Sequence, residues 1–144
     1  MQKLNKLIQR QSMVYLTKNH DYGNSFAESI AKHGEVAYIV RAEDKVRRIK
    51  TLMTKEAKVV DESIKDTIID LLNYTCMLVA YDEEMQDVVF YKFVHALNTY
   101  LTHPTSFMEM LVLMLDDVIT DEIHDYIVAF LIAETREEAP DDIS

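Results

Sequence analysis

The sequence predicts an all-α fold, a helical bundle of about six or seven helices, and two observations predict it. The 144 residues include only two glycines and two prolines, the residues that usually interrupt sheets and hairpins. Apolar residues recur instead at every third or fourth position through most of the chain, which is the spacing of one helix face. Because 49% of the residues are hydrophobic, the chain is long enough to bury a sizeable core. We therefore expect a single all-α domain over residues 1–137, with an acidic flexible tail at 138–144.

Charge and cysteine content exclude several classes of protein. A formal net charge of −10 argues against a general partner for nucleic-acid polymers or anionic membranes, which need clustered positive charge. The single cysteine, Cys76, rules out an internal disulfide and lies in an apolar run, where a buried and inert thiol is expected. The first residues, MQKLNKLIQRQS, are too polar for a signal peptide, and the densest apolar run, Met110–Leu115, is far short of the span of about 20 residues that a membrane requires, so neither secretion nor membrane insertion is expected. We expect a cytoplasmic protein, in the host cytoplasm if the chain is phage-encoded.

In the first half of the chain, the spacing predicts three helices. An amphipathic helix is expected over Leu4–Thr17, and Ser25 with Glu28 forms a capping-box pattern that begins a short helix, which Gly34 ends. A third helix is expected over Glu35–Met53. Its buried stripe is predicted to comprise Ile39, Ala42, Val46, Ile49 and Met53.

The second half predicts a linker at 55–60 and a central helix over Asp61–Tyr81. The acids 82–84 suit the start of a new helix with Met85 on its buried stripe, and the spacing leaves open whether this helix continues the central one without a break. Pro104 is expected in the first turn of a helix whose apolar part spans 106–118. Residues 120–122 are predicted to begin the last helix. The helix at 106–118 is apolar on most sides, so it is either central to the core or part of an oligomer interface.

The central helix carries acids at a regular spacing within apolar surroundings. Glu62, Asp66 and Asp70 stand at every fourth position, so at about 100° per residue they share one face with Asn73. Neighbouring carboxylates on such a face can hold Mg²⁺ together with waters and substrate phosphates. A solvated acidic stripe is the alternative explanation of this spacing.

The preceding helix has a basic face. Arg41, Asp44, Lys45 and Arg48 lie within about 100° of one another around its axis. Arg and Lys bind phosphate oxygens, and Asp44 could add a carboxylate to the metal site. A solvent-exposed set of ion pairs is the alternative.

Three sequence blocks extend this interpretation. They are K-x-x-D-Y-G-N-S-F at Lys18–Phe26, R-x-x-D-K-x-x-R at Arg41–Arg48, and D-E-S-I-x-D-T-I-x-D-L-x-N-Y at Asp61–Tyr74. With them, the chain resembles the phage and bacterial nucleotide modification associated domain of the first type, which is similar to the MazG-like all-α NTP pyrophosphatases. The resemblance implies a MazG-like core at about 1–82 with a C-terminal helical extension at 83–137.

The resemblance also implies a function. It suggests that the protein, with Mg²⁺, splits a (deoxy)nucleoside triphosphate into monophosphate and pyrophosphate. The expected metal ligands are Asp44, Glu62, Asp66 and Asp70, of which Asp44, Asp66 and Asp70 are the expected catalytic residues. Phosphate contacts are expected from Lys18, Arg41, Lys45 and Arg48, and base or sugar contacts from Asp21, Tyr22, Asn24 and Asn73. MazG-like enzymes have several acids in their first motif, where this chain has one well-placed acid, Asp44, so the pattern supports nucleotide binding more than catalysis.

Two other functions remain open from the sequence. The chain could be a phage-type module that sequesters a nucleotide or nucleotide signal without cleaving it. It could also be an acidic oligomeric protein whose C-terminal helices engage another protein. A homo-oligomer is expected in either case.

Overall fold

The computed structural model of the chain describes residues 2–22, 25–54 and 62–137, except for the side chains of residues 19–22, 62 and 63. Over these residues it contains seven α-helices, a short 3-10 helix and no strand, which confirms the all-α prediction. The elements are α1 (Gln2–Tyr22), α2 (Ser25–His33), α3 (Val36–Thr54), α4 (Glu62–Ala80), the 3-10 helix η2 (Gln86–Val88), α5 (Val89–Thr102), α6 (Pro104–Leu115) and α7 (Asp121–Thr135).

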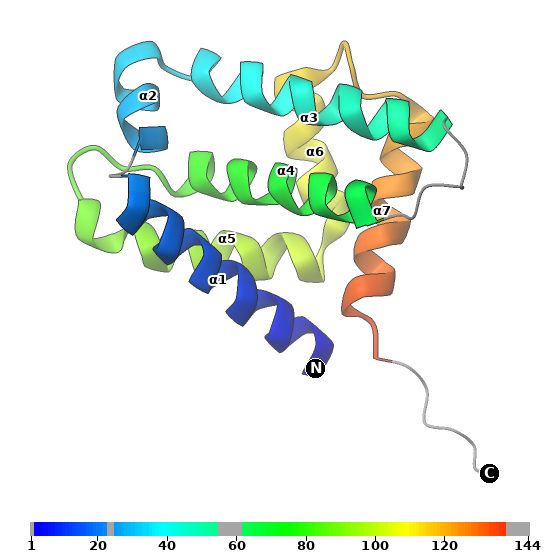
Figure 1. The fold of residues 1–144 in the computed structure, drawn as a ribbon, viewed down its shortest axis with the longest axis horizontal. Coiled ribbons are helices and arrows are strands. Elements are labelled where there is room, and N and C mark those ends of the chain that lie inside the picture. Colours follow the sequence, from blue (N-terminus) through cyan, green and yellow to red (C-terminus); the bar gives the residue numbers. More distant parts are fainter. Residues whose placement is uncertain (1, 23–24, 55–61, 138–144) are drawn as a thin grey trace.

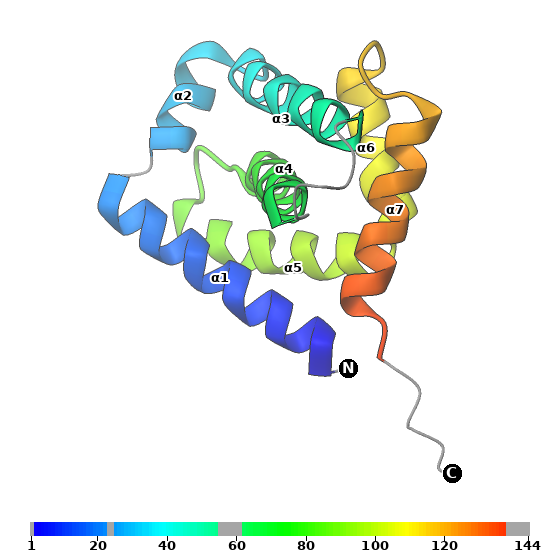
Figure 2. The ribbon, with the colours of Figure 1, turned by 45° about the vertical axis from the view of Figure 1, so that its right-hand side comes forward.

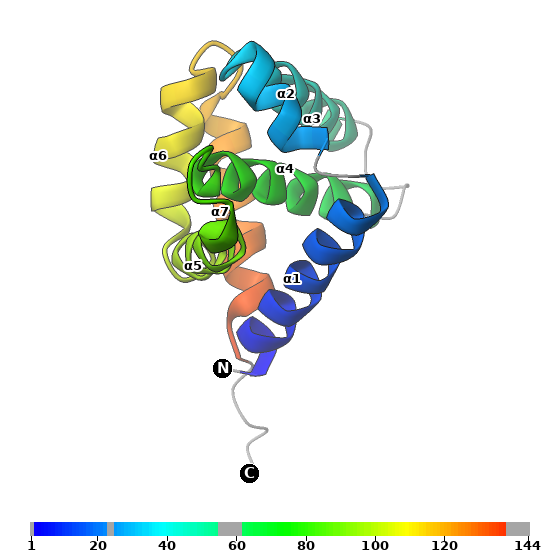
Figure 3. The same cartoon turned by 90° about the vertical axis from the view of Figure 1, so that its left-hand side faces the viewer.

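Helix α4 lies at the centre of the bundle (Figures 1 and 2). Helix α3 runs along one side of it and α5 along the other, and these are the most extensive helix contacts of α4. Helix α1 crosses the bundle diagonally, while α6 and α7 stand on the remaining side (Figure 3). The start of α1 reaches the end of α7, where the backbone N–H of Lys3 donates to the Glu137 carboxylate at 2.8 Å.

The apolar pattern of α4 explains this central position. Ile64, Ile68, Leu71 and Thr75, which the sequence places opposite the acids, are all buried. Cys76 is also fully buried, and burial raises the pKa of its thiol well above the usual range. The prediction of a buried cysteine is confirmed.

The buried stripe of α3 is turned slightly from the predicted one. Tyr38, with Ala42, Val46 and Ile49, is buried, whereas the predicted Ile39 and Met53 are only half-buried. The Thr75 hydroxyl donates to the Leu71 carbonyl at 2.8 Å, so the Tyr38 hydroxyl, 2.9 Å away, is the donor to Thr75. Burial raises the pKa of Tyr38 to about 12.

Three predicted helix boundaries are confirmed. Gly34 ends α2 with φ at 71°, a conformation that favours glycine. Pro104 is the first residue of α6, where its missing N–H costs no helical hydrogen bond. Thr120 precedes α7, and its hydroxyl accepts a hydrogen bond from the backbone N–H of Ile123.

The predicted helix start at the acids 82–84 is wrong. The Asp82 carboxylate accepts the backbone N–H groups of Glu84 and Met85, at 3.0 and 2.9 Å, and so forms a turn rather than a helix. Helix α5 begins only at Val89, and Met85 is exposed rather than part of a buried stripe.

Helix α6 is both a core helix and a surface helix. Phe107, Met108, Leu111 and Leu115 are buried, whereas the Leu113 side chain is 76% exposed. The homo-oligomer stays a prediction. Among the described helices, none combines the length and the apolar character that crossing a membrane requires. The predicted linker at 55–60 and tail at 138–144 lie outside the described residues.

Candidate functional site

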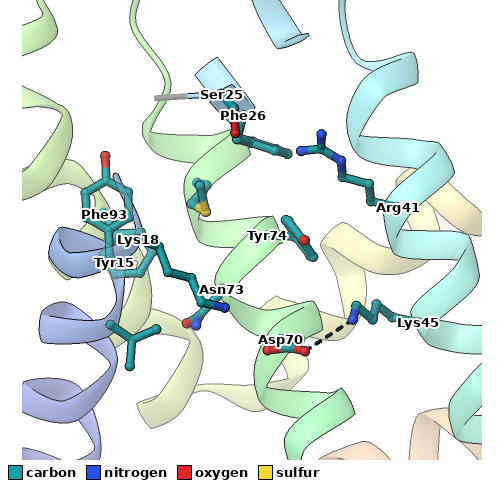
Figure 4. A pocket seen from close by; sticks show the side chains of 12 residues that line it. Tyr15, Lys18, Ser25, Phe26, Arg41, Lys45, Asp70, Asn73, Tyr74 and Phe93 are labelled. Carbon is teal, nitrogen blue, oxygen red and sulfur yellow. Dashed lines mark hydrogen bonds and ion pairs between the residues drawn. The ribbon is translucent and has the colours of Figure 1, made fainter. Parts of the chain in front are cut away.

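A cavity of about 400 Å³ lies beside α4, between α1 on one side and α2 and α3 on the other (Figure 4). We call it the basic pocket. Its lining comprises Val14, Tyr15, Lys18, Ser25, Phe26, Arg41, Lys45, Asp70, Asn73, Tyr74, Met77 and Phe93. Three of these side chains are cationic and one is anionic, so the lining has a formal charge of +2 (three minus one) in a chain of net charge −10.

Two cations of the basic pocket come from neighbouring turns of α3. Arg41 and Lys45 flank the buried stripe, so their heads emerge where α3 meets α4. The Arg41 guanidinium lies 5.2 Å from the ring centre of Phe26 and 5.9 Å from that of Tyr74. Cation–π attraction to both rings holds it at the pocket wall. Lys18 comes from α1 on the opposite side and is exposed.

Asp70 is the carboxylate of the basic pocket and is paired. Its Oδ2 atom lies 3.2 Å from Lys45 Nζ, with 38% of the Asp70 side chain and 26% of the Lys45 side chain exposed. This pair brings one residue of the basic face of α3 against one of the acids of α4.

A second cavity of about 620 Å³ adjoins the first along α4. We call it the amide pocket. It is lined by Arg10, Gln11 and Val14 of α1, Lys65, Asp66, Ile69, Asp70 and Asn73 of α4, and Phe130 and Glu134 of α7. Val14, Asp70 and Asn73 line both cavities, so the two form neighbouring compartments between α1 and α4.

Two amides connect α1 and α4 in the amide pocket. Asn73 Nδ2 donates to Gln11 Oε1 at 2.9 Å, and the Gln11 residue is only 6% exposed. Asn73 Oδ1 is buried and has no hydrogen-bond partner among the described residues. Sequence reasoning predicted Asn73 but missed Gln11. The signal was available, because Gln11 continues the spacing of the buried Leu4 and Leu7 and is therefore a polar residue on an inward face.

Asp44 does not join the acids of α4, contrary to the prediction. Its side chain is 74% exposed and lies 3.8 Å from the guanidinium of Arg47. The reason is helical geometry, because Asp44 is two residues after the buried Ala42 and points about 160° away from it. Arg48 is also exposed and does not line the basic pocket.

The remaining predicted residues divide into two groups. Asp66 is exposed at the edge of the amide pocket, one turn before Asp70. The side chains of Asp21, Tyr22, Asn24 and Glu62 lie outside the described residues.

The described residues contain no group of three or more His, Cys, Asp or Glu that could hold a metal ion. Asp66 and Asp70 nevertheless supply two carboxylates on one face of α4, both at the amide pocket. Mg²⁺ commonly takes one or two carboxylates from a protein and completes its shell with waters and substrate phosphates. This donor pair fits a magnesium ion shared with a phosphate-bearing ligand.

Comparison with protein families gives a description for the central part of the chain. The family model described as nucleotide modification associated domain 1 matches residues 18–80. Searches of curated proteins and of solved structures each gave no match. The similarity to MazG-like enzymes therefore stays a prediction. The match includes Lys18, Arg41, Lys45 and Asp70, the charged side chains of the basic pocket, and excludes Gln11 and all of α7. Residues 18–80 are thus similar to nucleotide modification associated domain 1.

Proposed function

We propose that the protein binds a nucleotide, with the phosphates in the basic pocket. The observation that carries this proposal is the convergence of Lys18, Arg41 and Lys45 on one cavity of a strongly acidic chain. Three cations at one cavity attract a polyanion, and Arg and Lys are the side chains that bind phosphate oxygens. The description of the matched family supports a nucleotide as the source of the phosphates.

Calorimetric titration with nucleoside triphosphates tests this proposal. Arg41→Met and Lys18→Met should each weaken binding about tenfold or more, because a hydrogen bond to a charged group contributes about 1.5–3 kcal/mol. Arg48→Met is the matched control, since Arg48 lies on the same helix and outside the pocket. Equal losses in Arg48→Met and Arg41→Met, or no binding to the unaltered protein, would contradict the proposal.

Magnesium-dependent hydrolysis of the bound triphosphate is the second candidate function. The specific observation that favours it is the pair Asp66 and Asp70, one turn apart and next to the basic pocket. Bound Mg²⁺ would stabilise negative charge on the phosphate oxygens. In the reaction a water oxygen bonds to the α-phosphorus, the bond to the bridging oxygen breaks, pyrophosphate leaves and a proton is released. Lys18, Arg41 and Lys45 would hold the phosphates during this step.

Separation of the products after incubation with Mg²⁺ distinguishes the candidates. Monophosphate with pyrophosphate supports the hydrolase, and tightly bound but intact nucleotide supports the sequestering module. Asp66→Asn and Asp70→Asn should each abolish turnover while leaving the circular dichroism spectrum unchanged. Full turnover in both variants would remove these carboxylates from the mechanism.

A further inference from the structure

We infer that the Gln11–Asn73 pair recognises the nucleoside half of the ligand in the amide pocket. Part of this pocket is formed by residues of α1 and α7 that lie outside the matched segment 18–80. This inference rests on the proposed nucleotide binding, and it specifies the part of the protein that would contact the base. The two cavities adjoin, since Val14, Asp70 and Asn73 line both, so a ligand with its phosphates at Lys45 would extend past Asp70 and Asn73 to place its base in the amide pocket.

The aromatic side chains of the basic pocket are poorly placed to stack on a base. Tyr15 is stacked on Phe93 with ring centres 4.4 Å apart, and Phe93 is fully buried. The rings of Phe26 and Tyr74 are both in contact with the Arg41 guanidinium. Since these ring faces already have partners within the protein, the basic pocket is better suited to phosphates than to a base.

The amide pocket differs from the basic pocket in its amide groups. Its lining holds charges of both signs, from Arg10, Lys65, Asp66, Asp70 and Glu134, of which Lys65 and Glu134 are paired at 3.7 Å. It also offers amide groups from Gln11 and Asn73 and the ring of Phe130. The Asn73 amide nitrogen donates to Gln11, and the Asn73 amide oxygen is buried with no partner in the described part of the chain. A buried acceptor without a partner is costly, and a ligand N–H group that reached it would relieve this cost. Nucleobase edges place N–H donors beside carbonyl or ring-nitrogen acceptors, which is the pattern that an amide complements.

Recognition would therefore depend on α1 and α7. Gln11, Phe130 and Glu134 lie outside residues 18–80, whereas the charged residues of the basic pocket lie inside. A site that hydrogen-bonds its ligand through buried polar groups discriminates strongly against ligands that leave these groups unpaired. In this arrangement residues 18–80 supply the phosphate site, and the flanking helices set the base preference.

Calorimetry with inorganic tripolyphosphate and a panel of nucleoside triphosphates tests the inference. The full chain should bind at least one nucleoside triphosphate about tenfold more tightly than tripolyphosphate. Gln11→Leu should remove this preference and leave the affinity for tripolyphosphate unchanged, which also shows that the variant is folded. Gln9→Leu is the control, because Gln9 is exposed on another face of α1. The double variant Gln11→Leu with Asn73→Leu should lose no more affinity for the preferred nucleoside triphosphate than either single variant, because the two amides act as one unit.

The outcomes separate the two proposals. Binding of tripolyphosphate with no preference for any nucleoside triphosphate would overturn the inference and leave phosphate binding in place. A preference that survives in Gln11→Leu but disappears in Tyr74→Leu would place the base in the basic pocket and also overturn it. No binding of either ligand class would overturn the proposed function and the inference together.

Discussion

Asp70 lies where the basic pocket and the amide pocket meet, and its carboxylate is bound to Lys45. A phosphate and Asp70 would compete for the same ammonium group. Both side chains are partly exposed, so solvent screening keeps the strength of the pair modest. Asp70 is therefore expected to oppose phosphate binding when no metal ion is present.

Asp70→Asn tests this competition. In the presence of a chelator, the variant should bind tripolyphosphate several-fold more tightly than the unaltered protein, because the substitution frees Lys45 and removes a negative charge. Calorimetry at about 50 mM salt gives the clearest measurement, since higher salt screens the effect. Asp44→Asn makes the same charge change outside the pocket and should alter the affinity much less. Weaker binding by Asp70→Asn without metal would contradict the competition.

Individual residues of the site were partly predictable from sequence. Arg41, Lys45 and Asp70 were expected at the site because helical spacing places them on facing sides of two helices. Asp44 was assigned to the same face because Arg41, Asp44, Lys45 and Arg48 lie within about 100° of one another, but Asp44 is at the edge of that face farthest from the buried stripe and points to solvent. Gln11 was missed although its spacing from Leu4 and Leu7 places it on the inward face of α1. Its pairing with Asn73 could not be predicted, because that contact depends on α1 lying against α4.

The pairing of α3 with α4 includes a polar contact within the core. The Tyr38 hydroxyl donates to Thr75, which in turn donates to Leu71 of its own helix. Tyr38→Phe removes the first bond, while Thr75 keeps the second. We expect a loss of about 1 kcal/mol in the free energy of unfolding, measured by urea titration. Tyr91→Phe, at a residue that is 72% exposed, should change the stability little, and equal losses in the two variants would argue against the buried bond.

The turn between α4 and α5 should make stability depend on pH. The hydrogen bond from Lys92 is the main cause that holds the pKa of Asp82 below its usual value. Hydrogen bonds from the backbone N–H groups of Met85 and Glu84 lower this pKa further. A carboxylate whose pKa is lower in the folded state stabilises the fold above its unfolded pKa, and this stabilisation is lost as the pH falls through its folded pKa. Asp82→Asn should thus be less stable than the unaltered protein at pH 7, and the difference should shrink as the pH falls below about 4 and vanish below the lowered pKa of Asp82.

Thermal unfolding at several pH values measures this difference. Asp116→Asn is a suitable control, because it removes the same charge from an exposed position. A stability gap for Asp82→Asn that stays constant from neutral to acid pH would contradict the role of the charged carboxylate.

Helix boundaries were predictable where one residue type decides them. Gly34, Pro104 and Thr120 each mark a helix end through a property of the residue itself, and each prediction is confirmed. The acids at 82–84 were misleading because a carboxylate beside free backbone N–H groups can cap either a helix or a turn. Sequence alone does not separate these outcomes here.

At the scale of the whole molecule, residues 18–80 are only part of the structure that buries α4. The neighbouring α5 contributes Phe93, Leu97 and Leu101 to the same core, and all three are almost completely buried. A fragment of residues 1–82 would expose the surface of α4 that packs on α5.

We expect the 1–82 fragment to lack a cooperative thermal transition, because it loses about half of the helices that form the core. Circular dichroism melting of the fragment beside the full chain measures this. A sharp transition in the fragment would show that the matched segment folds as a separate unit, contrary to the single domain predicted for residues 1–137.

Helix α1 supplies one wall of both cavities, and the central helix α4 supplies another. The two walls should differ in their dynamics. Amide hydrogens of the buried α4 should exchange with solvent only through global unfolding, whereas those of the peripheral α1 should exchange through local opening. Outward motion of α1 would widen both cavities at once, so the rate of this opening would limit how quickly a ligand enters and leaves. A ligand bound between the walls should accordingly slow amide exchange in α1 far more than in α4.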